Sequence, residues 1–321
     1  MWNKKPMARA LVALAFIAAG CGATDHPARG PEPERGGGWI VAAAATMDGA
    51  RTQWGYFAVR PDGRDLRKLA FPEGEGGDLD ISADGRLAAL SLMRPDGAPD
   101  PGFDVVVSPV DVWKPRDLPL PHPFAISPSF SPDGKSLALA YGTDPDRSDL
   151  WLVSVDGRDL RRVAATGRVT SPAWSPQGSW IAFADERAAR QYEGAVIYLV
   201  RPDGTDLHRL AGEFARQRPA WSPDGTRVAL EDLEGQVVIV GRDGGGKRVL
   251  TADGGAPAWS PDGNWIAFER NVLTDSEGVY ALGLFVVPAE GGSAERIASF
   301  DGGNVEPLSW TQVQPVSSPT P

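Results

Sequence analysis

The side chains with which this chain could do chemistry are few and stand far apart. Its three histidines are His26, His122 and His208, and its single cysteine is Cys21, which leaves little material for a metal centre or for acid–base work. A run that resembles a calcium loop, residues 144–149, lacks the glycine and the glutamate that such a loop needs. The sequence also contains no Gly-x-Ser-x-Gly nucleophile motif. These residues predict no catalytic set, no bound metal and no cofactor.

The composition excludes several classes of protein. Hydrophobic residues make up 42% of the 321-residue chain and include eleven tryptophans, enough to fill a core. The 38 glycines and 29 prolines exceed ordinary usage, but not by enough to indicate a low-complexity chain. A formal net charge of −10 gives no electrostatic reason to bind nucleic acid or an anionic membrane surface. We therefore expect a folded domain without a nucleic-acid partner.

Cys21 stands at the end of a predicted secretion signal. A basic start precedes an eleven-residue apolar run, Ala10–Gly20, that is too short to span a membrane. The small residues directly before Cys21 resemble the lipobox of bacterial lipoproteins, although Ala18 stands where that family prefers leucine. The resemblance implies cleavage before Cys21, acylation of that cysteine, and attachment to an envelope membrane on its periplasmic side or at the cell surface. The alternative is ordinary secretion with cleavage elsewhere and a free thiol.

The sequence divides into four parts. Residues 1–20 are predicted to be the lipoprotein signal peptide, and residues 21–38 the lipidated cysteine with a disordered tether. Residues 39–313 form the folded domain, and residues 314–321 a disordered tail. Neither the tether nor the tail carries enough apolar side chains to offset the entropy of ordering it.

One motif is repeated along the folded domain. The string Pro-Ala-Trp-Ser-Pro-Asp-Gly occurs twice without change, and three further copies depart from it. Each copy leads into an apolar segment and a second apolar run, and most end in a polar turn and a short final segment, with no helical periodicity. Four antiparallel strands in a repeat of about 40–50 residues are typical of a propeller blade. The copies are residues 79–85, 128–134, 172–178, 219–225 and 257–263.

The two ends of the domain predict the number of blades. The N-terminal unit has three predicted strands and lacks the first, while Pro307–Trp310 near the C-terminus repeats only that first strand. We therefore predict an all-β fold, a six-bladed β-propeller of four-stranded antiparallel blades. In this fold the C-terminal strand joins the N-terminal blade and closes the ring.

The repeated motif, together with closing segments such as residues 203–211 (DGTDLHRLA), resembles the TolB-like six-bladed propeller family. The resemblance covers roughly residues 39–313 and implies the same propeller fold. The sequence has no counterpart to the N-terminal α/β domain of that family, and its lipid anchor is additional. It also lacks the Trp-Asp dipeptide that is typical of WD repeats.

The repeated residues are predicted to build a scaffold. Proline, aspartate and glycine in the Ser-Pro-Asp-Gly string are typical of a tight turn, and the motif tryptophans are expected to pack between blades. The connections at the opposite end of each blade are irregular, and irregular loops on a rigid scaffold are the usual place for binding. Four arginines in these connections are the predicted partner contacts: Arg187, Arg190, Arg216 and Arg218.

The leading hypothesis is a non-enzymatic, membrane-tethered scaffold that binds a protein or peptide of the bacterial envelope. It predicts a monomer that meets the membrane only through its lipid. The alternative is a propeller enzyme of the lyase or lactonase type, because related propellers hold metals or acidic sites in a central channel. Its candidate side chains come from connections that can reach the channel mouth: Glu73, Glu75, Asp78, His122, Asp253, Asp301 and Glu306.

Overall fold

The computed structural model describes residues 37–48, 51–69, 71, 77–94, 102–186, 194–215, 218–273, 280–300 and 305–311. The predicted signal peptide, Cys21 and the predicted tail lie outside these residues, so the lipid anchor stays a prediction. Regular structure within them is β-strand, apart from one short 3-10 helix, η1 (Pro145–Arg147). In the same part of the chain, no helix is both long and apolar enough to cross a membrane.

The described residues contain 24 strands. Their bounds are β1 (Trp39–Asp48), β2 (Arg51–Val59), β3 (Arg67–Lys68), β4 (Leu79–Ile81), β5 (Leu87–Met93), β6 (Phe103–Pro109), β7 (Arg116–Asp117), β8 (Phe124–Phe130), β9 (Ser136–Gly142), β10 (Ser148–Ser154), β11 (Arg161–Ala164), β12 (Val169–Trp174), β13 (Ile181–Asp185), β14 (Ala195–Val200), β15 (His208–Ala215), β16 (Ala220–Trp221), β17 (Arg227–Glu231), β18 (Val237–Gly241), β19 (Arg248–Thr251), β20 (Gly255–Trp259), β21 (Trp265–Leu273), β22 (Tyr280–Pro288), β23 (Glu295–Ser299) and β24 (Val305–Thr311).

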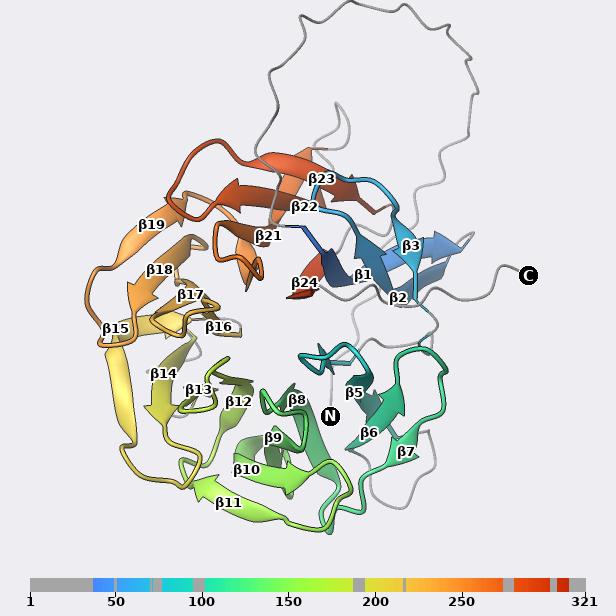
Figure 1. Cartoon of the computed structure of the whole chain (residues 1–321), viewed down its shortest axis with the longest axis vertical. Helices are drawn as coiled ribbons and strands as arrows, with labels where there is room; N and C mark the ends of the chain where they lie inside the picture. The colour runs from blue at the N-terminus through green and yellow to red at the C-terminus, as the bar shows by residue number, and fades with distance from the viewer. Residues whose placement is uncertain are drawn as a thin grey trace, which may run out of the picture. The chain divides into compact units, whose positions relative to one another are not determined.

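These strands pair into sheets of the propeller type. Three sheets run in sequence order, β12 to β15, β16 to β19 and β20 to β23, and a fourth has the order β24-β1-β2-β3. The largest has the order β11-β10-β9-β8-β6-β5-β4, with β7 paired to β6. A single parallel pair, Phe103 with Phe124, joins its two antiparallel halves. Figure 1 shows the sheets following one another around a common centre, so the domain is an all-β propeller of antiparallel four-stranded blades.

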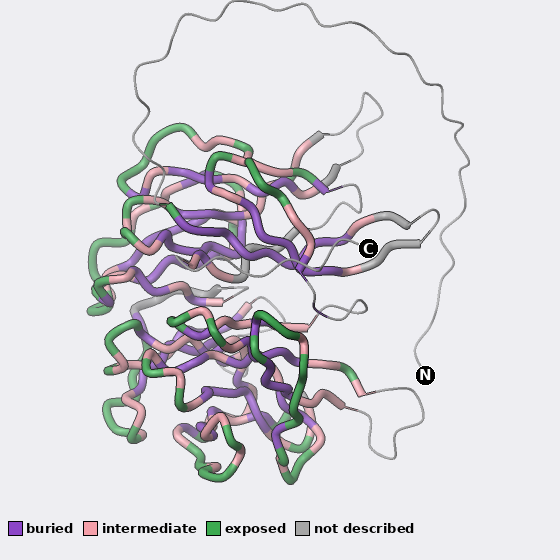
Figure 2. Tube along the Cα trace, turned by 45° about the vertical axis from the view of Figure 1, so that its right-hand side comes forward, coloured by how far each residue is buried: buried purple, intermediate pink, exposed green. Residues whose placement is uncertain are grey.

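The hydrophobic core lies between neighbouring sheets (Figure 2). Val41 of β1 belongs to the same buried cluster as Leu90 of β5. Ile40, the residue before it, belongs to a different cluster with Val286 of β22. Successive residues of a strand point to opposite faces of the sheet, so one strand contributes to two interfaces. This explains why the inner strands carry continuous apolar runs instead of alternating apolar and polar residues.

The Ser-Pro-Asp-Gly strings form the tight turns that the sequence predicts. In the copy at Ser222, Asp224 accepts the backbone N–H of Thr226 at 3.0 Å, and Gly225 has a φ of +65°. The serine has a part that the sequence analysis missed: its Oγ donates to Asp224 Oδ1 at 2.5 Å and accepts the N–H of Arg227 at 2.9 Å. The hydroxyl therefore satisfies the first strand N–H after the turn, and the buried serine belongs to the scaffold.

Two of the connections at the irregular end of the blades are partly strand where the structure describes them. Met47 and Asp48 belong to β1 and residues 51–54 belong to β2, so the hairpin extends into the first of these connections. Residues 270–273 belong to β21 and residues 280–281 belong to β22, so the second connection is also partly strand. Polar side chains in these segments indicated loops, but the backbone ladder continues wherever two antiparallel chains stay adjacent, whatever the side chains.

Candidate functional site

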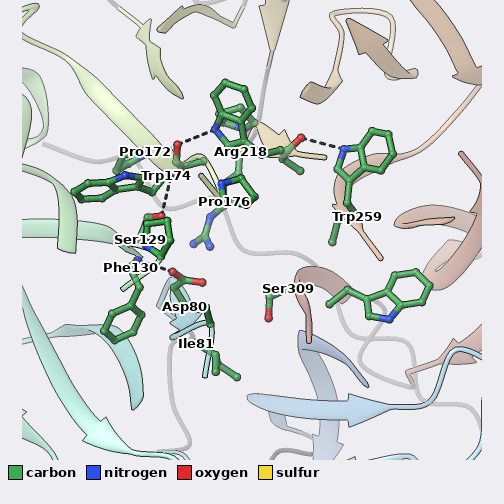
Figure 3. Close-up of a pocket in the computed structure, with 18 of the residues that line it drawn as sticks. Asp80, Ile81, Ser129, Phe130, Pro172, Trp174, Pro176, Arg218, Trp259 and Ser309 are labelled. Carbon is green, nitrogen blue, oxygen red and sulfur yellow. Dashed lines mark hydrogen bonds between the residues drawn. The ribbon is translucent and has the colours of Figure 1, made fainter. Parts of the chain in front are cut away.

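The first strands of the sheets and the turns after them line a cavity of about 330 Å³ (Figure 3). We call it the channel cavity. Two charged side chains, Asp80 and Arg218, are part of its lining, and the remainder is mostly apolar. Much of the apolar wall comes from equivalent motif positions: Pro128, Pro172, Pro219 and Pro257, each followed two residues later by Phe130, Trp174, Trp221 and Trp259.

Asp78 and Arg218 occupy the same position in their repeats, four residues before the motif serines Ser82 and Ser222. Nη2 of Arg218 donates to Oδ1 of Asp78, which makes an ion pair between residues 140 positions apart. Oγ of Ser127 donates to the other carboxylate oxygen of Asp78 at 2.5 Å. Burial opposes ionisation here, but Arg218 and the Ser127 hydroxyl outweigh it and hold the pKa of Asp78 below its ordinary value. Asp78 is therefore a carboxylate at neutral pH.

Asp80 follows two residues later and faces the channel cavity. Its Oδ2 accepts the backbone N–H of Phe130 at 2.7 Å. Burial raises the pKa of Asp80 to about 6, against the opposing effects of that N–H and of the Arg218 charge. Neighbouring carboxyl groups thus have their pKa values moved in opposite directions, and Asp80 changes charge within the range of about pH 5 to 7.

Hydrogen bonds from the motif residues tie neighbouring first strands together around the cavity. Nε1 of Trp221 donates to the carbonyl oxygen of Ala173 at 3.0 Å, and Nε1 of Trp259 donates to that of Ala220 at 3.1 Å. The two tryptophans are only 7% and 6% exposed, which confirms that they pack between sheets. Between β8 and β12 a serine makes the connection instead: Oγ of Ser129 accepts the backbone N–H of Trp174 at 3.0 Å. The wall of the cavity is thus a hydrogen-bonded part of the scaffold.

The structure does not bring the predicted channel-mouth residues into one group where it describes them. Asp78 pairs with Arg218, which lines the channel cavity, while His122 is exposed and donates its backbone N–H to the Tyr141 hydroxyl at 2.7 Å. Asp253 is exposed and pairs with Arg270 at 2.8 Å. Among the described residues, no three or more histidine, cysteine, aspartate or glutamate side chains are placed to hold a metal ion. Glu306 lies in β24 without a described side chain, and Glu73, Glu75 and Asp301 lie outside the described residues.

Of the four predicted partner contacts, only Arg218 is described, and its side chain is 19% exposed within the channel. Arg187, Arg190 and Arg216 lie outside the described residues, so their role stays a prediction. The sequence analysis missed Asp80. A signal for it exists, because Asp80 stands two residues before its motif serine, where the other described copies have only small residues: Ser129, Ala173, Ala220 and Ala258.

Antiparallel four-stranded blades around a shared channel define a β-propeller domain. The chain belongs to the TolB beta propeller domain family, whose model matches residues 121–314. No curated protein matches the sequence.

Solved structures share the fold at low sequence identity. TolB from Acinetobacter baumannii has a TM-score of 0.65 at 16% identity, over 85% of this chain and 66% of that one. A putative TolB from Agrobacterium tumefaciens has a TM-score of 0.61 at 17% identity, over 82% of this chain and 90% of that one. An oligogalacturonate lyase from Vibrio parahaemolyticus has a TM-score of 0.50 at 14% identity, over 85% and 83% of the two chains. Likeness at these identities concerns the fold alone, and this chain spans less than two thirds of the Acinetobacter protein.

Proposed function

We propose that this protein is a non-enzymatic, lipid-anchored protein of the bacterial envelope, whose propeller binds a partner protein or peptide. The observation that carries the proposal is a contrast between the two ends of the blades. Connections after the first strand of a blade have five or six residues, and those after the third strand have six or seven. At the opposite end, connections between the second and third strands vary from two to nine residues. A uniform end and an irregular end are typical of a scaffold that presents binding loops.

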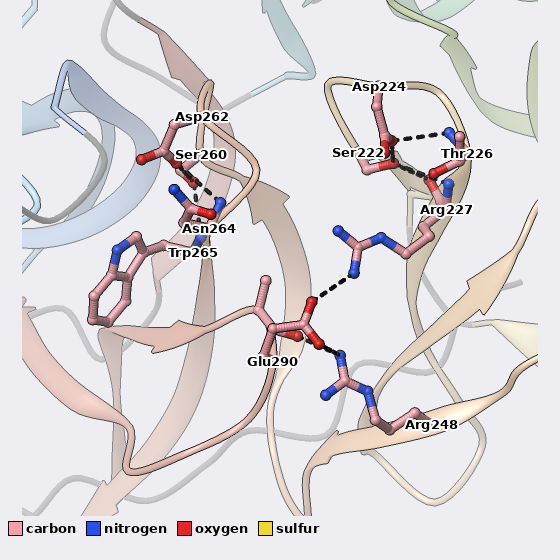
Figure 4. A network of polar contacts seen from close by, with 11 residues as sticks. Ser222, Asp224, Thr226, Arg227, Arg248, Ser260, Asp262, Asn264, Trp265 and Glu290 are labelled. Carbon is pink, nitrogen blue, oxygen red and sulfur yellow. Dashed lines mark hydrogen bonds and ion pairs between the residues drawn. The ribbon is translucent and has the colours of Figure 1, made fainter.

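Contacts between neighbouring sheets support the role of a rigid scaffold. Glu290, after β22, pairs with Arg227 at 3.0 Å and with Arg248 at 3.5 Å, both in the preceding sheet (Figure 4). Arg161 of β11 donates to the carbonyl oxygen of Pro202 in the following sheet at 2.7 Å. Exposed ion pairs of this kind add little free energy each, but they fix how adjacent sheets lie.

Six blades in a closed ring are part of the proposal. Dividing the eight-stranded sheet at its single parallel pair gives six four-stranded units. Strand β24 pairs with β1, and the first unit shares buried clusters with both the second and the last. A Cβ atom on Gly63 would lie 2.7 Å from the carbonyl oxygen of Ile297, so a turn of the first unit rests against β23.

The proposed anchor is Cys21, with residues 1–20 as signal peptide, residues 21–38 as lipidated cysteine and tether, residues 39–313 as propeller and residues 314–321 as tail. The lipobox-like residues before Cys21 support it. The test is the mass of protein extracted from membranes, compared between the native chain and Cys21→Ala. Loss of the acyl mass and release from the membrane fraction are expected, and an unchanged mass and fractionation would refute the anchor.

The partner surface is tested by charge reversal at the irregular end. A variant carrying Arg187→Glu, Arg190→Glu and Arg216→Glu is compared with the native chain in a crosslinking pull-down from cell envelopes. A variant carrying Arg64→Glu, Arg86→Glu and Arg158→Glu is the matched control, because these three arginines are exposed in turns at the uniform end. Loss of a captured partner in the first variant alone is expected. A partner retained equally by both variants would contradict the proposed surface.

The alternative function, a propeller enzyme, has one observation in its favour. Asp80 lines the channel cavity, Asp78 stands two residues before it, and their pKa values are moved in opposite directions, which is typical of a paired acid and base. The fold likeness to an oligogalacturonate lyase suggests the substrate to try first. Oligogalacturonate incubated with the native chain and with Asp80→Asn is assayed for unsaturated products. Turnover by the native chain that is lost in the variant would replace the binding proposal.

A further inference from the structure

The channel cavity runs along the first strands and reaches the end of the blades that carries the uniform turns. Its lining includes Ala83, Pro132 and Pro176, which belong to the Ser-Pro-Asp-Gly turns or their counterparts. These turns lie at the end opposite the irregular connections, because alternate connections of an antiparallel blade fall at opposite ends. Arg218 belongs to the lining as well as to the predicted partner contacts, but the variants that test the cavity leave Arg187, Arg190 and Arg216 unchanged, so the test of the cavity does not depend on the partner proposal.

The charges around the cavity leave one negative charge in excess. Arg218 is paired with Asp78, and Asp80 is the other carboxylate in this part of the channel. Two carboxylates against one guanidinium make a net charge of about −1 when both are ionised. Figure 3 shows the carboxylate of Asp80 directed into the cavity, with one oxygen on the Phe130 N–H. The cavity thus presents an anionic acceptor in an apolar surround.

The rest of the wall suits the apolar part of a cationic group. Motif tryptophans line the cavity, and an aromatic wall beside a carboxylate is the usual environment of a bound ammonium or guanidinium. Ser309 also belongs to the lining, and its Oγ is a buried atom without a hydrogen-bond partner among the described groups. Figure 3 shows Asp80 and Ser309 on adjacent strands of the cavity wall. A hydroxyl in this place can accept a second N–H from a cationic group that is paired with Asp80.

We propose that the channel cavity binds one cationic group, an alkylammonium or a guanidinium, whose charge pairs with Asp80. A volume of about 330 Å³ is at the lower limit of ordinary ligand pockets and suits one such group with its aliphatic stem. The group can belong to a free amine or to a basic side chain of a peptide. A divalent metal fits poorly, because calcium takes six to eight oxygen ligands and the lining has one carboxylate.

The probes are agmatine, for a free amine, and the capped tripeptide acetyl-Gly-Arg-Gly-amide, for a peptide. Binding is measured by calorimetry and by the fluorescence of the lining tryptophans. The same tripeptide with neutral citrulline in place of arginine is the ligand control, and its binding is expected to be at least tenfold weaker. The cationic probe that binds with the higher affinity shows whether the bound group belongs to a free amine or to a peptide. Equal binding of the arginine and citrulline peptides, or calcium chloride binding more tightly than both cationic probes, would overturn the proposal.

Asp80→Asn removes the charge and keeps an oxygen for the Phe130 N–H. We expect it to weaken the cationic probes at least tenfold, and Ser309→Ala to weaken them a few fold. Asp117→Asn is the matched control, because Asp117 is exposed on β7 of the same sheet and outside the cavity. Circular dichroism checks the fold of each variant. Unchanged affinity in a folded Asp80→Asn variant sinks the proposal.

A titration of the native chain makes the test independent of any variant. The charged group that acts on Asp80 among the described residues is Arg218, and it stays charged throughout the range of interest. The facing lining residues on β8 and β24 are uncharged where their side chains are described: Ser129, Phe130, Ser309 and Trp310. Because Asp80 loses its charge below about pH 6, affinity for agmatine should fall several-fold from pH 7.5 to 5. Affinity that does not change over this range would count against Asp80 as the acceptor.

Discussion

The guanidinium of Arg218 is paired with the carboxylate of Asp78, although two motif repeats separate the sheets that carry them. Both residues stand four positions before a motif serine. In three other copies of the motif this position holds a small, uncharged residue: Ser127, Ser171 or Ala256. At those three positions the backbone has a positive φ, between 46° and 52°. The pair is therefore a feature of two particular repeats, and it ties one side of the channel to another.

Removing one member of this pair should destabilise the domain. Arg218→Met leaves Asp78 and Asp80 without the guanidinium, so we expect a loss of about 1–3 kcal/mol in the free energy of unfolding. Asp78→Asn should cost less, because Arg218 can then turn its charge toward Asp80. Chemical denaturation of the two single variants and the double variant measures the coupling, expected to be at least about 1 kcal/mol.

The control for this cycle is an exposed pair of the same residue types. Arg64 and Asp62 lie 3.6 Å apart with side chains 83% and 48% exposed. Asp62→Asn should change the free energy of unfolding by less than about 0.5 kcal/mol. Additive effects of Arg218→Met and Asp78→Asn would show that the channel pair contributes no more than such a surface pair.

Asp80 should make the domain less stable as the pH rises toward neutral. Its pKa is raised to about 6 in the folded chain from an ordinary value of 3.8, so the folded state binds more protons between these two values. The free energy of unfolding should therefore fall from about pH 4 to 6 through this group, and level off above pH 6. Asp80→Asn should remove this slope and gain up to about 2–3 kcal/mol at pH 7, with no gain at pH 4.

The measurement is a set of urea denaturation curves between about pH 4 and pH 7.5. The opposite effect of Asp78 does not interfere, because its lowered pKa places its loss of stabilisation below about pH 4. A variant whose stability follows the same pH slope as the native chain would mean that Asp80 titrates normally.

Sequence alone predicts the repeated parts of this molecule well. The turns at the motif glycines follow from local chemistry, since a Pro-Asp-Gly string has few other conformations. The contact between Arg218 and Asp78 could not be predicted, because it depends on where two distant repeats lie around one centre. For the same reason the sequence predicts Arg218 as a partner contact at the irregular end, whereas the structure places it in the lining of the channel cavity. Asp80 differs from the small residues at the same position in the other copies. The sequence does not show that its carboxylate is buried, and it is this burial that raises its pKa.

The motif tryptophans allow the free energy of one interblade hydrogen bond to be measured. Nε1 of Trp221 donates to Ala173, whereas the buried Nε1 of Trp174 has no hydrogen-bond partner among the described groups. Both Trp→Phe changes remove the same atoms, so their difference reports the bond. We expect Trp221→Phe to cost about 1 kcal/mol more than Trp174→Phe in thermal or chemical unfolding. Equal costs would assign the role of Trp221 to packing alone.

The motif serines should matter more for stability than their place in a surface turn suggests. Ser260 is 0% exposed, and its Oγ donates to Asp262 at 2.6 Å and accepts the N–H of Trp265 at 2.9 Å (Figure 4). Ser260→Ala leaves that N–H without its partner in a buried place, so we expect a loss of about 1–3 kcal/mol. Ser154 makes a similar set of bonds in a more exposed turn, where water can replace the hydroxyl, and Ser154→Ala should cost less than half as much.

A second readout separates this effect from a general loosening of the turn. Burial opposes ionisation of Asp262, but hydrogen bonds from Ser260 and Asn264 outweigh it and hold its pKa below the ordinary value. Because Ser260→Ala removes one of those donors, the pKa of Asp262 should rise in the variant, as followed by carboxyl resonances during an NMR titration. The turn would then lose stability at acidic pH sooner than in the native chain, since the carboxylate takes up its proton at a higher pH. If the pKa of Asp262 stays the same while stability falls, the serine acts through the Trp265 N–H alone.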